Sequence, residues 1–257
     1  MNKASMKPLI VSGIFMTPDH QKIAYRHYQG GHDKVIVIVH GFYNSKDAVL
    51  LKQLADSLTD RYDVLMFDFR GHGKSSGLYT WTSREGQDLL VALDFVEGKY
   101  KNVGMIAFSL GASIAINTLS RGNKVNSLIC VSAVSDPNRV DYQFWKLNLK
   151  SDLVYTLFTA EGWKGRGFRA GPFWLKKEKP IDNVAKLNSS ILFIHGEKDW
   201  VIKPWHSQAL YDKTRSSKKL VIIRNGSHAE YLMKDFREEF LPEVKSWFEL
   251  TLKEDVS

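Results

Sequence analysis

The stretch Val103-Gly-Met-Ile-Ala-Phe-Ser-Leu-Gly-Ala112 places a short apolar run directly before a serine that is followed by small residues. An apolar segment of helical length, Leu110–Leu119, continues from it. A serine on a tight turn from a strand into a helix holds its Oγ above the edge of the sheet, as in the nucleophile elbow. The turn needs small neighbours because the strand and the helix nearly touch, and Ala107, which replaces the usual Gly, is small enough. Ser109 is therefore the candidate nucleophile, and its alternative role is to cap the helix.

Strand-like and helix-like segments alternate along the rest of the chain. The predicted strands are Val11–Met16, Lys22–Tyr28, Val35–Val39, Asp63–Phe69, Val103–Phe108, Ser127–Val134, Ile191–His195 and Leu220–Arg224. The predicted helices are Lys46–Thr59, Ser83–Glu97, Leu110–Leu119, a stretch near Trp205–Tyr211, and a last helix from about Glu230 to Leu252. This alternation predicts an α/β fold with a mostly parallel central sheet flanked by helices. The first two strands form a hairpin, which adds antiparallel strands at one edge.

Residues 137–187 interrupt this alternation. The segment carries ten Lys and Arg residues against five Asp and Glu residues, so it supplies +5 of the net charge of +8. It is also rich in aromatic residues and glycine. A long insertion of this kind between strands is more often a functional lid than a linker. We therefore expect residues 1–136 and 188–257 to form the core, and residues 137–187 to form an inserted lid.

A nucleophilic serine needs a base, and the base needs an acid that orients it. His228 lies in a turn between the last predicted strand and the last helix, which makes it the candidate base. Its rival His195 ends a strand, where we expect a hydrogen-bonded core residue. Asp199, in a loop after the same strand, is the candidate acid, since its carboxylate can accept the Nδ1–H of the base. Its rival Asp136 precedes a proline, and such a pair commonly only starts a turn.

The sequence His40-Gly-Phe42 follows the strand Val35–Val39 directly. A short turn there can present a backbone N–H group to a developing oxyanion. The predicted donors are the amides of Phe42 and of Leu110, the residue after the candidate nucleophile. The alternative is a plain strand exit in which Gly41 takes a positive φ. We expect aromatic residues of this turn and of the lid to line an apolar substrate pocket, namely Phe42, Tyr43, Trp145, Phe158 and Trp174.

The loop Asp68-Phe-Arg-Gly-His-Gly-Lys-Ser-Ser76 has the glycines and basic residues of a phosphate-binding loop. It lacks the G-x-x-x-x-G-K-[ST] spacing, and no helix follows it directly. We expect a structural turn in which Arg70 and His72 make local hydrogen bonds. No zinc, calcium or dinucleotide-binding motif appears elsewhere, so the sequence predicts neither a metal nor a cofactor.

Composition excludes several classes of protein. The chain has 257 residues, 44% of them hydrophobic and 25% charged, and one Cys. These values exclude a collagen, a disordered tail and a disulfide scaffold. No apolar run approaches the roughly 18 residues of a membrane span. The short run Leu9–Met16 is interpreted as a strand rather than a signal segment, so we expect a cytoplasmic protein without integral membrane association. Nucleic acid ranks last among partners for the positive charge, because no binding motif accompanies it.

The chain resembles α/β-hydrolase fold proteins over nearly all of its length. The residues that carry the resemblance are His40-Gly-Phe42, Asp68-x-Arg70-Gly-His-Gly-x-Ser75, Phe108-Ser-Leu-Gly111, Gly196-x-x-Asp199 and Gly226-Ser-His228. Within that fold it is most similar to small bacterial carboxylesterases and to monoacylglycerol-lipase-like (serine aminopeptidase S33-like) enzymes with an inserted lid. This resemblance implies ester hydrolysis without a cofactor, with Ser109 as nucleophile, His228 as base and Asp199 as its partner.

Two other functions remain open at this stage. The same three residues serve a thioesterase, whose acyl-CoA or acyl-carrier substrate would suit a basic lid. A ligand-binding receptor on a hydrolase fold is the non-enzymatic alternative. The expected partner is a small-molecule ester or thioester. The acyl chain, the leaving group and the oligomeric state are left open.

Overall fold

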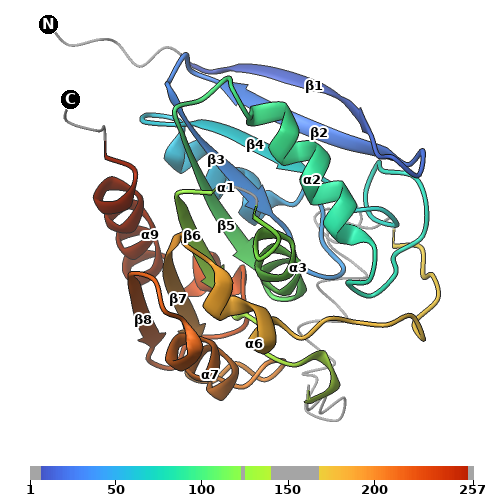
Figure 1. Ribbon diagram of the computed structural model, residues 1–257. Coiled ribbons are helices and arrows are strands. Elements are labelled where there is room, and N and C mark those ends of the chain that lie inside the picture. The colour runs from blue at the N-terminus through green and yellow to red at the C-terminus, as the bar shows by residue number, and fades with distance from the viewer. Residues whose placement is uncertain (1–6, 123–124, 140–167, 254–257) are drawn as a thin grey trace, which may run out of the picture.

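The computed structural model describes residues 7–122, 125–139 and 168–253. Its centre is an eight-stranded sheet with the strand order β1-β2-β4-β3-β5-β6-β7-β8 (Figure 1). The strands are β1 (Leu9–Met16), β2 (Lys22–Gln29), β3 (Lys34–Val39), β4 (Asp63–Phe67), β5 (Asn102–Phe108), β6 (Ser127–Val131), β7 (Ser190–Gly196) and β8 (Lys218–Ile223). Strands β3 to β8 pair in parallel, whereas β1 with β2, and β2 with β4, pair antiparallel. The mostly parallel sheet with an antiparallel hairpin at one edge is confirmed.

Helices cover both faces of this sheet (Figure 1). They are α1 (Val49–Leu58), α2 (Glu85–Val96), α3 (Leu110–Leu119), α6 (Pro180–Asn183), α7 (Trp205–Lys213), α8 (Tyr231–Asp235) and α9 (Arg237–Thr251), with short 3₁₀ turns η1 (Pro137–Arg139) and η3 (Val184–Lys186). Helices α2, α3 and α7 pack on one face, and α1, α8 and α9 pack on the other.

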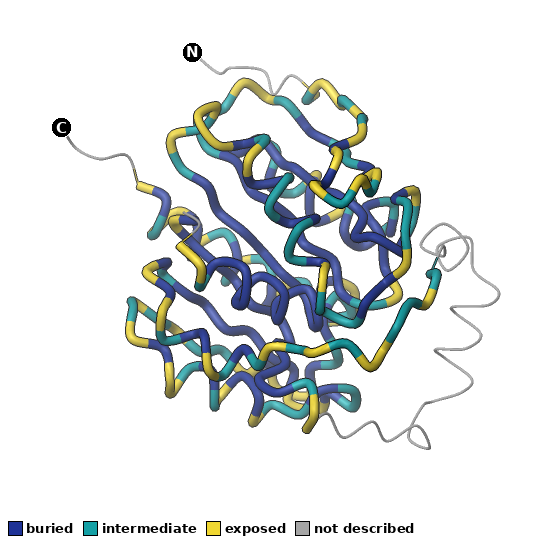
Figure 2. The backbone as a smooth tube through the Cα atoms, turned by 45° about the vertical axis from the view of Figure 1, so that its right-hand side comes forward, coloured by how far each residue is buried: buried dark blue, intermediate teal, exposed yellow. Residues whose placement is uncertain are grey.

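The β-branched strand β3 shows why the sheet needs both layers. Its Val35, Val37 and Val39 face the α2–α3 layer, and its Ile36 and Ile38 face the α1–α9 layer. All five side chains are at most 1% exposed. Because successive residues of a strand point to opposite faces, an unbroken apolar strand requires cover on both sides. Figure 2 shows this buried centre as a dark blue tube beneath more exposed helices and loops.

The helix predicted at Ser83–Glu97 begins two residues later, at Glu85. Trp81 and Thr82 before it have φ values of 55° and 78°, which a helix cannot contain. The buried Glu85 carboxylate instead accepts hydrogen bonds from the amide and the hydroxyl of Thr80, at 2.5 and 2.9 Å. The predicted start of this helix was therefore two residues early, and contacts with Thr80 hold the observed start.

The last predicted helix is divided into α8 and α9. Phe236 interrupts it with φ −134° and ψ 35°, outside the helical region. Both halves still bury apolar side chains against the same face of the sheet, including Leu232 from α8 and Phe248 from α9. The division leaves α8 directly after the loop that carries His228.

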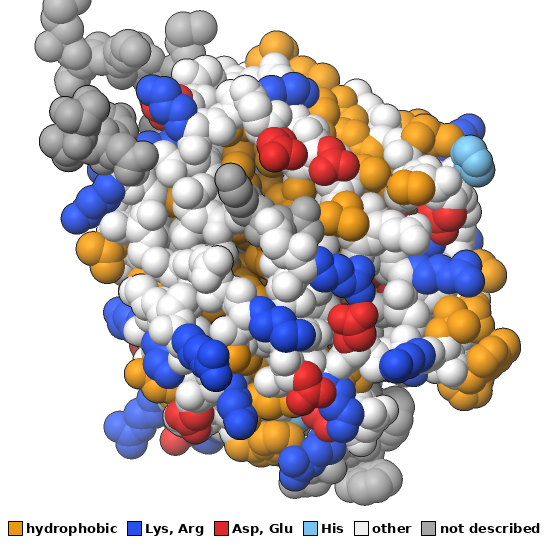
Figure 3. Space-filling model, in the orientation of Figure 1, with side chains coloured by type: hydrophobic (Ala, Val, Ile, Leu, Met, Phe, Trp, Pro, Cys, Tyr) orange, Lys and Arg blue, Asp and Glu red, His pale blue; other side chains and the backbone are white. Residues whose placement is uncertain are grey.

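Part of the predicted lid range lies outside the described residues. The end of that range packs on the core, since Val184 and Leu187 are at most 3% exposed and belong to the cluster under α3. Figure 3 shows Lys and Arg side chains interspersed with Asp and Glu on one face of the molecule. Two ion pairs join this range to the core, Glu178 with Arg121 at 2.6 Å and Lys179 with Asp136 at 2.9 Å.

Candidate active site

Ser109 lies in the turn between β5 and α3, where its backbone takes φ 51° and ψ −121°. Non-glycine residues seldom enter the positive-φ region, and such strain is found mainly at functional sites. The Ser109 amide donates a hydrogen bond to the carbonyl of Val131 at the end of β6, at 2.8 Å. The side chain occupies the position that precedes α3 but makes no capping hydrogen bond to that helix. The capping interpretation of this serine is therefore not what the structure shows.

Two glycines let the neighbouring loop reach the serine. A Cβ on Gly41 would lie 3.1 Å from the Phe108 carbonyl oxygen and 3.2 Å from the Ser109 Cβ. A Cβ on Gly111 would overlap the carbonyl group of His40. Any larger residue at position 111 would separate the β3 exit from the start of α3.

The predicted oxyanion donors lie at this close approach. Leu110 is the first residue of α3, so its amide is one of the N-terminal N–H groups that have no acceptor within the helix. Phe42 directly follows Gly41, which packs against Ser109. The helix start also favours negative charge beside it. The amides of Phe42 and Leu110 remain the predicted oxyanion donors.

The buried Asp199 forms a hydrogen-bonded pair with the partly exposed His228. The Nδ1 of His228 lies 2.8 Å from Oδ2 of Asp199. The other carboxylate oxygen accepts the amides of Val201 and Ile202, both at 2.9 Å. Burial opposes ionisation of Asp199, but the charge of His228 and the hydrogen bonds of His195 and His228 outweigh it and hold the pKa of this carboxyl well below its usual range. Asp199 is thus an ionised hydrogen-bond acceptor at neutral pH.

Contacts along the end of β6 bring the His228 loop to the serine turn. Val131 accepts the amide of Ser109, and the next residue, Ser132, accepts the amide of Ala229 through its Oγ at 3.0 Å. The end of β6 therefore contacts both Ser109, the candidate nucleophile, and Ala229, the residue after the candidate base His228. The sequence analysis missed Ser132, since no motif marks it.

A second contact joins the base loop to the β3 exit. The side-chain amide of Asn44 donates to Glu230, two residues after His228, at 2.6 Å. Asn44 itself follows Phe42 and Tyr43 in the loop that supplies the predicted oxyanion donor. This pair also escaped the sequence analysis, because its members lie 186 positions apart.

The two rival residues are placed differently. Asp136 accepts the amide of Asn138 at 2.9 Å and pairs with Lys179 at 2.9 Å, as expected of a residue that starts a turn. His195 is fully buried, as expected, but it also lies beside the candidate acid, with Nε2 3.2 Å from Oδ2 of Asp199.

The prediction that Arg70 makes local hydrogen bonds was wrong. Its guanidinium binds Asp88 of α2 at 2.7 and 2.9 Å and Asp19 of the β1–β2 turn at 2.7 Å. These partners are 18 and 51 residues away, so the loop after β4 ties α2 to the hairpin.

His72 makes one local contact and one long-range contact. Its Nδ1 donates to the carbonyl of Arg70 at 3.2 Å, and its Nε2 accepts the amide of Tyr43 at 3.3 Å. Burial lowers the pKa of His72 to about 3, so the ring is neutral and can accept. This neutral ring holds the loop that carries Phe42.

An aromatic cluster surrounds the predicted pocket residue Phe42. Its ring lies 5.2 Å from Trp81, 5.6 Å from Tyr79 and 4.8 Å from Phe168. With Leu110 these side chains form an apolar cluster beside the serine turn. Tyr79 and Trp81 were not predicted as pocket residues, although they closely follow the glycine-rich loop in the sequence.

The other predicted pocket residues lie apart or outside the described residues. Tyr43 is 43% exposed at the rim of the cluster, 6.0 Å from the ring of Phe42. Trp174 is 74% exposed and packs on Phe173. Trp145 and Phe158 lie outside the described residues.

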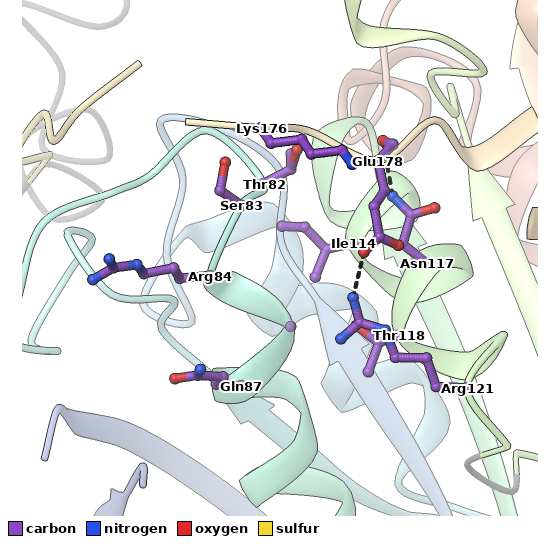
Figure 4. A pocket seen from close by; sticks show the side chains of 11 residues that line it. Thr82, Ser83, Arg84, Gln87, Ile114, Asn117, Thr118, Arg121, Lys176 and Glu178 are labelled. Carbon is purple, nitrogen blue, oxygen red and sulfur yellow. Dashed lines mark hydrogen bonds and ion pairs between the residues drawn. The ribbon is translucent and has the colours of Figure 1, made fainter. Parts of the chain in front are cut away.

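A separate polar cavity of 90 Å³ opens between the start of α2, the outer end of α3 and the segment before α6 (Figure 4). Glu178 accepts a hydrogen bond from Arg121 across it, at 2.6 Å, as the dashed line in Figure 4 marks. None of Ser109, Asp199 and His228 lines it. Within residues 7–122, 125–139 and 168–253, no three His, Cys, Asp or Glu side chains gather as a metal site would require. In the same residues, no helix is both long enough and apolar enough to span a membrane.

Comparison with known proteins agrees with this architecture. A model of the alpha/beta hydrolase family matches residues 36–243. The chain belongs to the alpha/beta hydrolase family. That range contains the serine turn, the Asp199–His228 pair and both predicted oxyanion donors.

Individual relatives are distant. The chain is 29% identical to the uncharacterized protein YqkD of Bacillus subtilis over 65% of its length, and 24% identical to the uncharacterized protein YfhR of Escherichia coli K12 over 76%. It spans 56% and 64% of those two proteins. Among solved structures, the Pyrococcus furiosus esterase Pf2001 superposes with a TM-score of 0.78 at 22% identity, covering 96% of this chain and 92% of that one. This likeness confirms the α/β-hydrolase fold.

Proposed function

We propose that this protein is a serine hydrolase that cleaves carboxylic esters through an acyl-enzyme intermediate. The observation that carries the proposal is the 2.8 Å hydrogen bond between the buried Asp199 carboxylate and Nδ1 of His228, in a loop joined through β6 to the strained turn of Ser109. Family membership supports a hydrolase, and the structural likeness to a protein described as an esterase supports an ester as the substrate.

The geometry suits a two-step acyl transfer. Asp199 accepts the Nδ1–H of His228, so Nε2 is the nitrogen that takes the proton of Ser109 as its Oγ attacks the ester carbonyl. The amides of Phe42 and Leu110 donate to the oxyanion of the tetrahedral intermediate. His228 then returns the proton to the leaving alcohol, and the acyl group remains on Ser109. Water repeats the sequence and releases the acid.

The apolar cluster beside Ser109 favours an ester with an apolar acyl or alcohol group. Phe42, Tyr79, Trp81 and Phe168 present aromatic surface next to the predicted oxyanion donor. Residues 137–187 act in this proposal as an inserted lid over that surface. The substrate is a small molecule, and neither a metal nor a cofactor takes part in the steps above.

A fluorophosphonate probe tests the nucleophile, since it forms a covalent bond with an activated serine. We expect the wild-type protein to be labelled at Ser109 and the Ser109→Ala variant not to be labelled. The same substitution should lower ester turnover by about 10⁶, as loss of the nucleophile does in a well-studied triad. Ser113→Ala is the matched control, because Ser113 lies one turn further along α3 and donates to the Val134 carbonyl at 3.0 Å. Labelling that persists in Ser109→Ala would overturn the assignment.

A thioesterase is the second candidate. The basic, partly exposed segment that contains Lys176 and Lys177 favours it, since an acyl-CoA carries phosphates. Turnover of p-nitrophenyl esters, monoacylglycerols and acyl-CoAs by the wild-type protein separates the two. A higher kcat/KM for acyl-CoAs than for every oxygen ester would replace the ester proposal with the thioester one.

A further inference from the structure

Two histidines contact the same carboxylate oxygen of the candidate acid. Oδ2 of Asp199 lies 2.8 Å from Nδ1 of His228 and 3.2 Å from Nε2 of His195. We propose that His195 is a positioning residue, which holds the Asp199 carboxylate in the orientation that His228 needs. The inference rests on the proposed function, in which that carboxylate orients the base.

Hydrogen bonds around the ring determine which nitrogen of His195 carries the proton. Nε2 lies 2.8 Å from the Ile202 carbonyl, an acceptor, so it carries a hydrogen, and the same nitrogen lies 3.2 Å from Oδ2 of Asp199. Nδ1 lies 2.6 Å from Oγ of Ser207 and accepts its hydroxyl proton. Ser207 belongs to α7 and is fully buried. The helix therefore holds the N–H of His195 on the loop that carries the acid, where it donates to the Ile202 carbonyl.

The contacts of Asp199 then divide by oxygen. Oδ1 takes two backbone amides, from Val201 and Ile202, which fix the position of that atom. If the carboxylate turned about its fixed Oδ1 atom, Oδ2 would still move away from His228. The N–H of His195 opposes this rotation, because its positive end lies 3.2 Å from Oδ2 while it bonds the carbonyl of Ile202 in the same loop.

Bulk solvent does not reach that N–H group in the folded protein. Asp199 is 1% exposed, and His195 and Ser207 are not exposed at all. A buried carbonyl that loses its donor, and a buried carboxylate that loses a neighbouring N–H dipole, both lose stabilisation that is strong in a medium of low dielectric. Loss of the His195 donor should therefore change the acid and, through it, the base.

Two amide variants of His195 place an N–H donor near one or the other of the two ring-nitrogen positions. Glutamine places its amide nitrogen at about the position of Nε2, and asparagine places it at about that of Nδ1. We expect His195→Asn to lower kcat for p-nitrophenyl butyrate by about tenfold or more, with KM changed less than about twofold. His195→Gln should keep kcat within about threefold of the wild type.

The pH profile and proton NMR report the role that a merely structural residue would not have. The acid limb of kcat/KM follows the base of the free enzyme, and we expect it to move in His195→Asn and to stay in His195→Gln. The low-field proton NMR signal of the hydrogen bond between His228 and Asp199 should shift or broaden in the Asn variant only. This signal does not depend on turnover.

Controls use another buried histidine. His27, on β2 near the other edge of the sheet from β7, is 2% exposed and contacts Tyr100 and Gln29. His27→Asn should leave kcat, the acid limb and the low-field signal unchanged. If the His195 variants do not fold, Ser207→Ala keeps the ring but removes the hydroxyl that orients it, and should lower kcat by roughly threefold with the same shift of the acid limb.

The outcomes separate the two levels of the argument. If wild-type protein hydrolyses esters and His195→Asn has wild-type kcat, acid limb and NMR signal, the positioning role is wrong while the proposed function stands. Equal losses in the Asn and Gln variants, with an unmoved acid limb, would also overturn it. If wild-type protein neither turns over esters nor reacts with the fluorophosphonate probe, the proposed function fails and the inference falls with it.

Discussion

At Ser109 the backbone, rather than the side chain, sets the position of the reactive atom. Its φ of 51° is a conformation that costs on the order of 1–3 kcal/mol for a residue with a Cβ. The hydrogen bond to Val131 and the packed start of α3 hold it there. This backbone conformation places Ser109 at the sheet edge, beside the loop that carries Gly41 and Phe42.

The choice of acid gives a prediction at the scale of one residue. Asp199→Asn should lower kcat for ester hydrolysis by about 10³ to 10⁴, because an amide donates where the carboxylate accepts and so favours the wrong tautomer of His228. Asp136→Asn should change kcat less than about threefold, since Asp136 contacts Asn138 and Lys179 instead. Steady-state kinetics on folded protein, checked by circular dichroism, measure both. The opposite ranking of the two variants would move the acid to the end of β6.

Between elements, the loop after β4 acts as a buried connection. Arg70 binds Asp88 on α2 and Asp19 on the β1–β2 turn, and its side chain is 3% exposed. The hydrogen bonds from Arg70 hold the pKa of Asp19 below its usual value despite partial burial. The hairpin edge and the helix that covers it thus share one guanidinium.

A second prediction follows for this element contact. Arg70→Leu should lower the free energy of unfolding by about 3–5 kcal/mol, because it leaves the buried Asp88 carboxylate unpaired. The control is Arg61→Leu, which removes an exposed pair with Glu249 and should cost less than about 1 kcal/mol. Urea unfolding followed by fluorescence measures both. Recovery of most of the loss in the double variant Arg70→Leu/Asp88→Leu would confirm that the unpaired charge is the cause.

For the whole molecule, buried neutral histidines make the fold less stable in acid. Burial lowers the pKa of His40 to about 4 and that of His72 to about 3. Both rings accept a backbone amide, His40 from Phe69 at 3.0 Å, and protonation would abolish that acceptor. His40 and His72 thus join the loop after β3 to the loop after β4, and the first of these loops carries Phe42.

The sign of the pH effect follows from linkage. Above about pH 6.5 both rings are neutral whether the chain is folded or unfolded, so their contribution is complete. Below that pH the unfolded chain binds protons that the folded one does not, and stability falls until the folded pKa is reached. His40 alone should account for about 3 kcal/mol between pH 6.5 and pH 4, at about 1.4 kcal/mol for each pKa unit. The raised pKa of Asp88, about 7, acts in the opposite direction over the same range, so urea unfolding from pH 7.5 to 4 compares the wild type with a His40→Gln variant. The same pH dependence in both proteins would contradict the prediction.

Local patterns in the sequence determined the elements and the candidate triad. The unbroken apolar run of β3 requires two covered faces, and the small residues around Ser109 are needed wherever a strand turns sharply into a helix. His228 and Asp199 could be chosen because a parallel sheet brings the residues after its strands to one edge, in a known chain order. These inferences depend on spacing within about ten residues, which a sequence displays directly.

Tertiary structure alone decided the contacts that cross the sheet order. Arg70 reaches Asp19 and Asp88 because β2 lies beside β4, a neighbour relation that no local pattern contains. Ser132 and Asn44 meet the His228 loop only after β6 and β3 are placed between the sheet edges. His195 looked like a core residue because its burial follows from its strand, whereas its contact with Asp199 depends on how the loop after β7 folds back over that strand's end. The local sequence thus predicts which residues are buried, but the packing of distant segments determines which partner a buried polar group has.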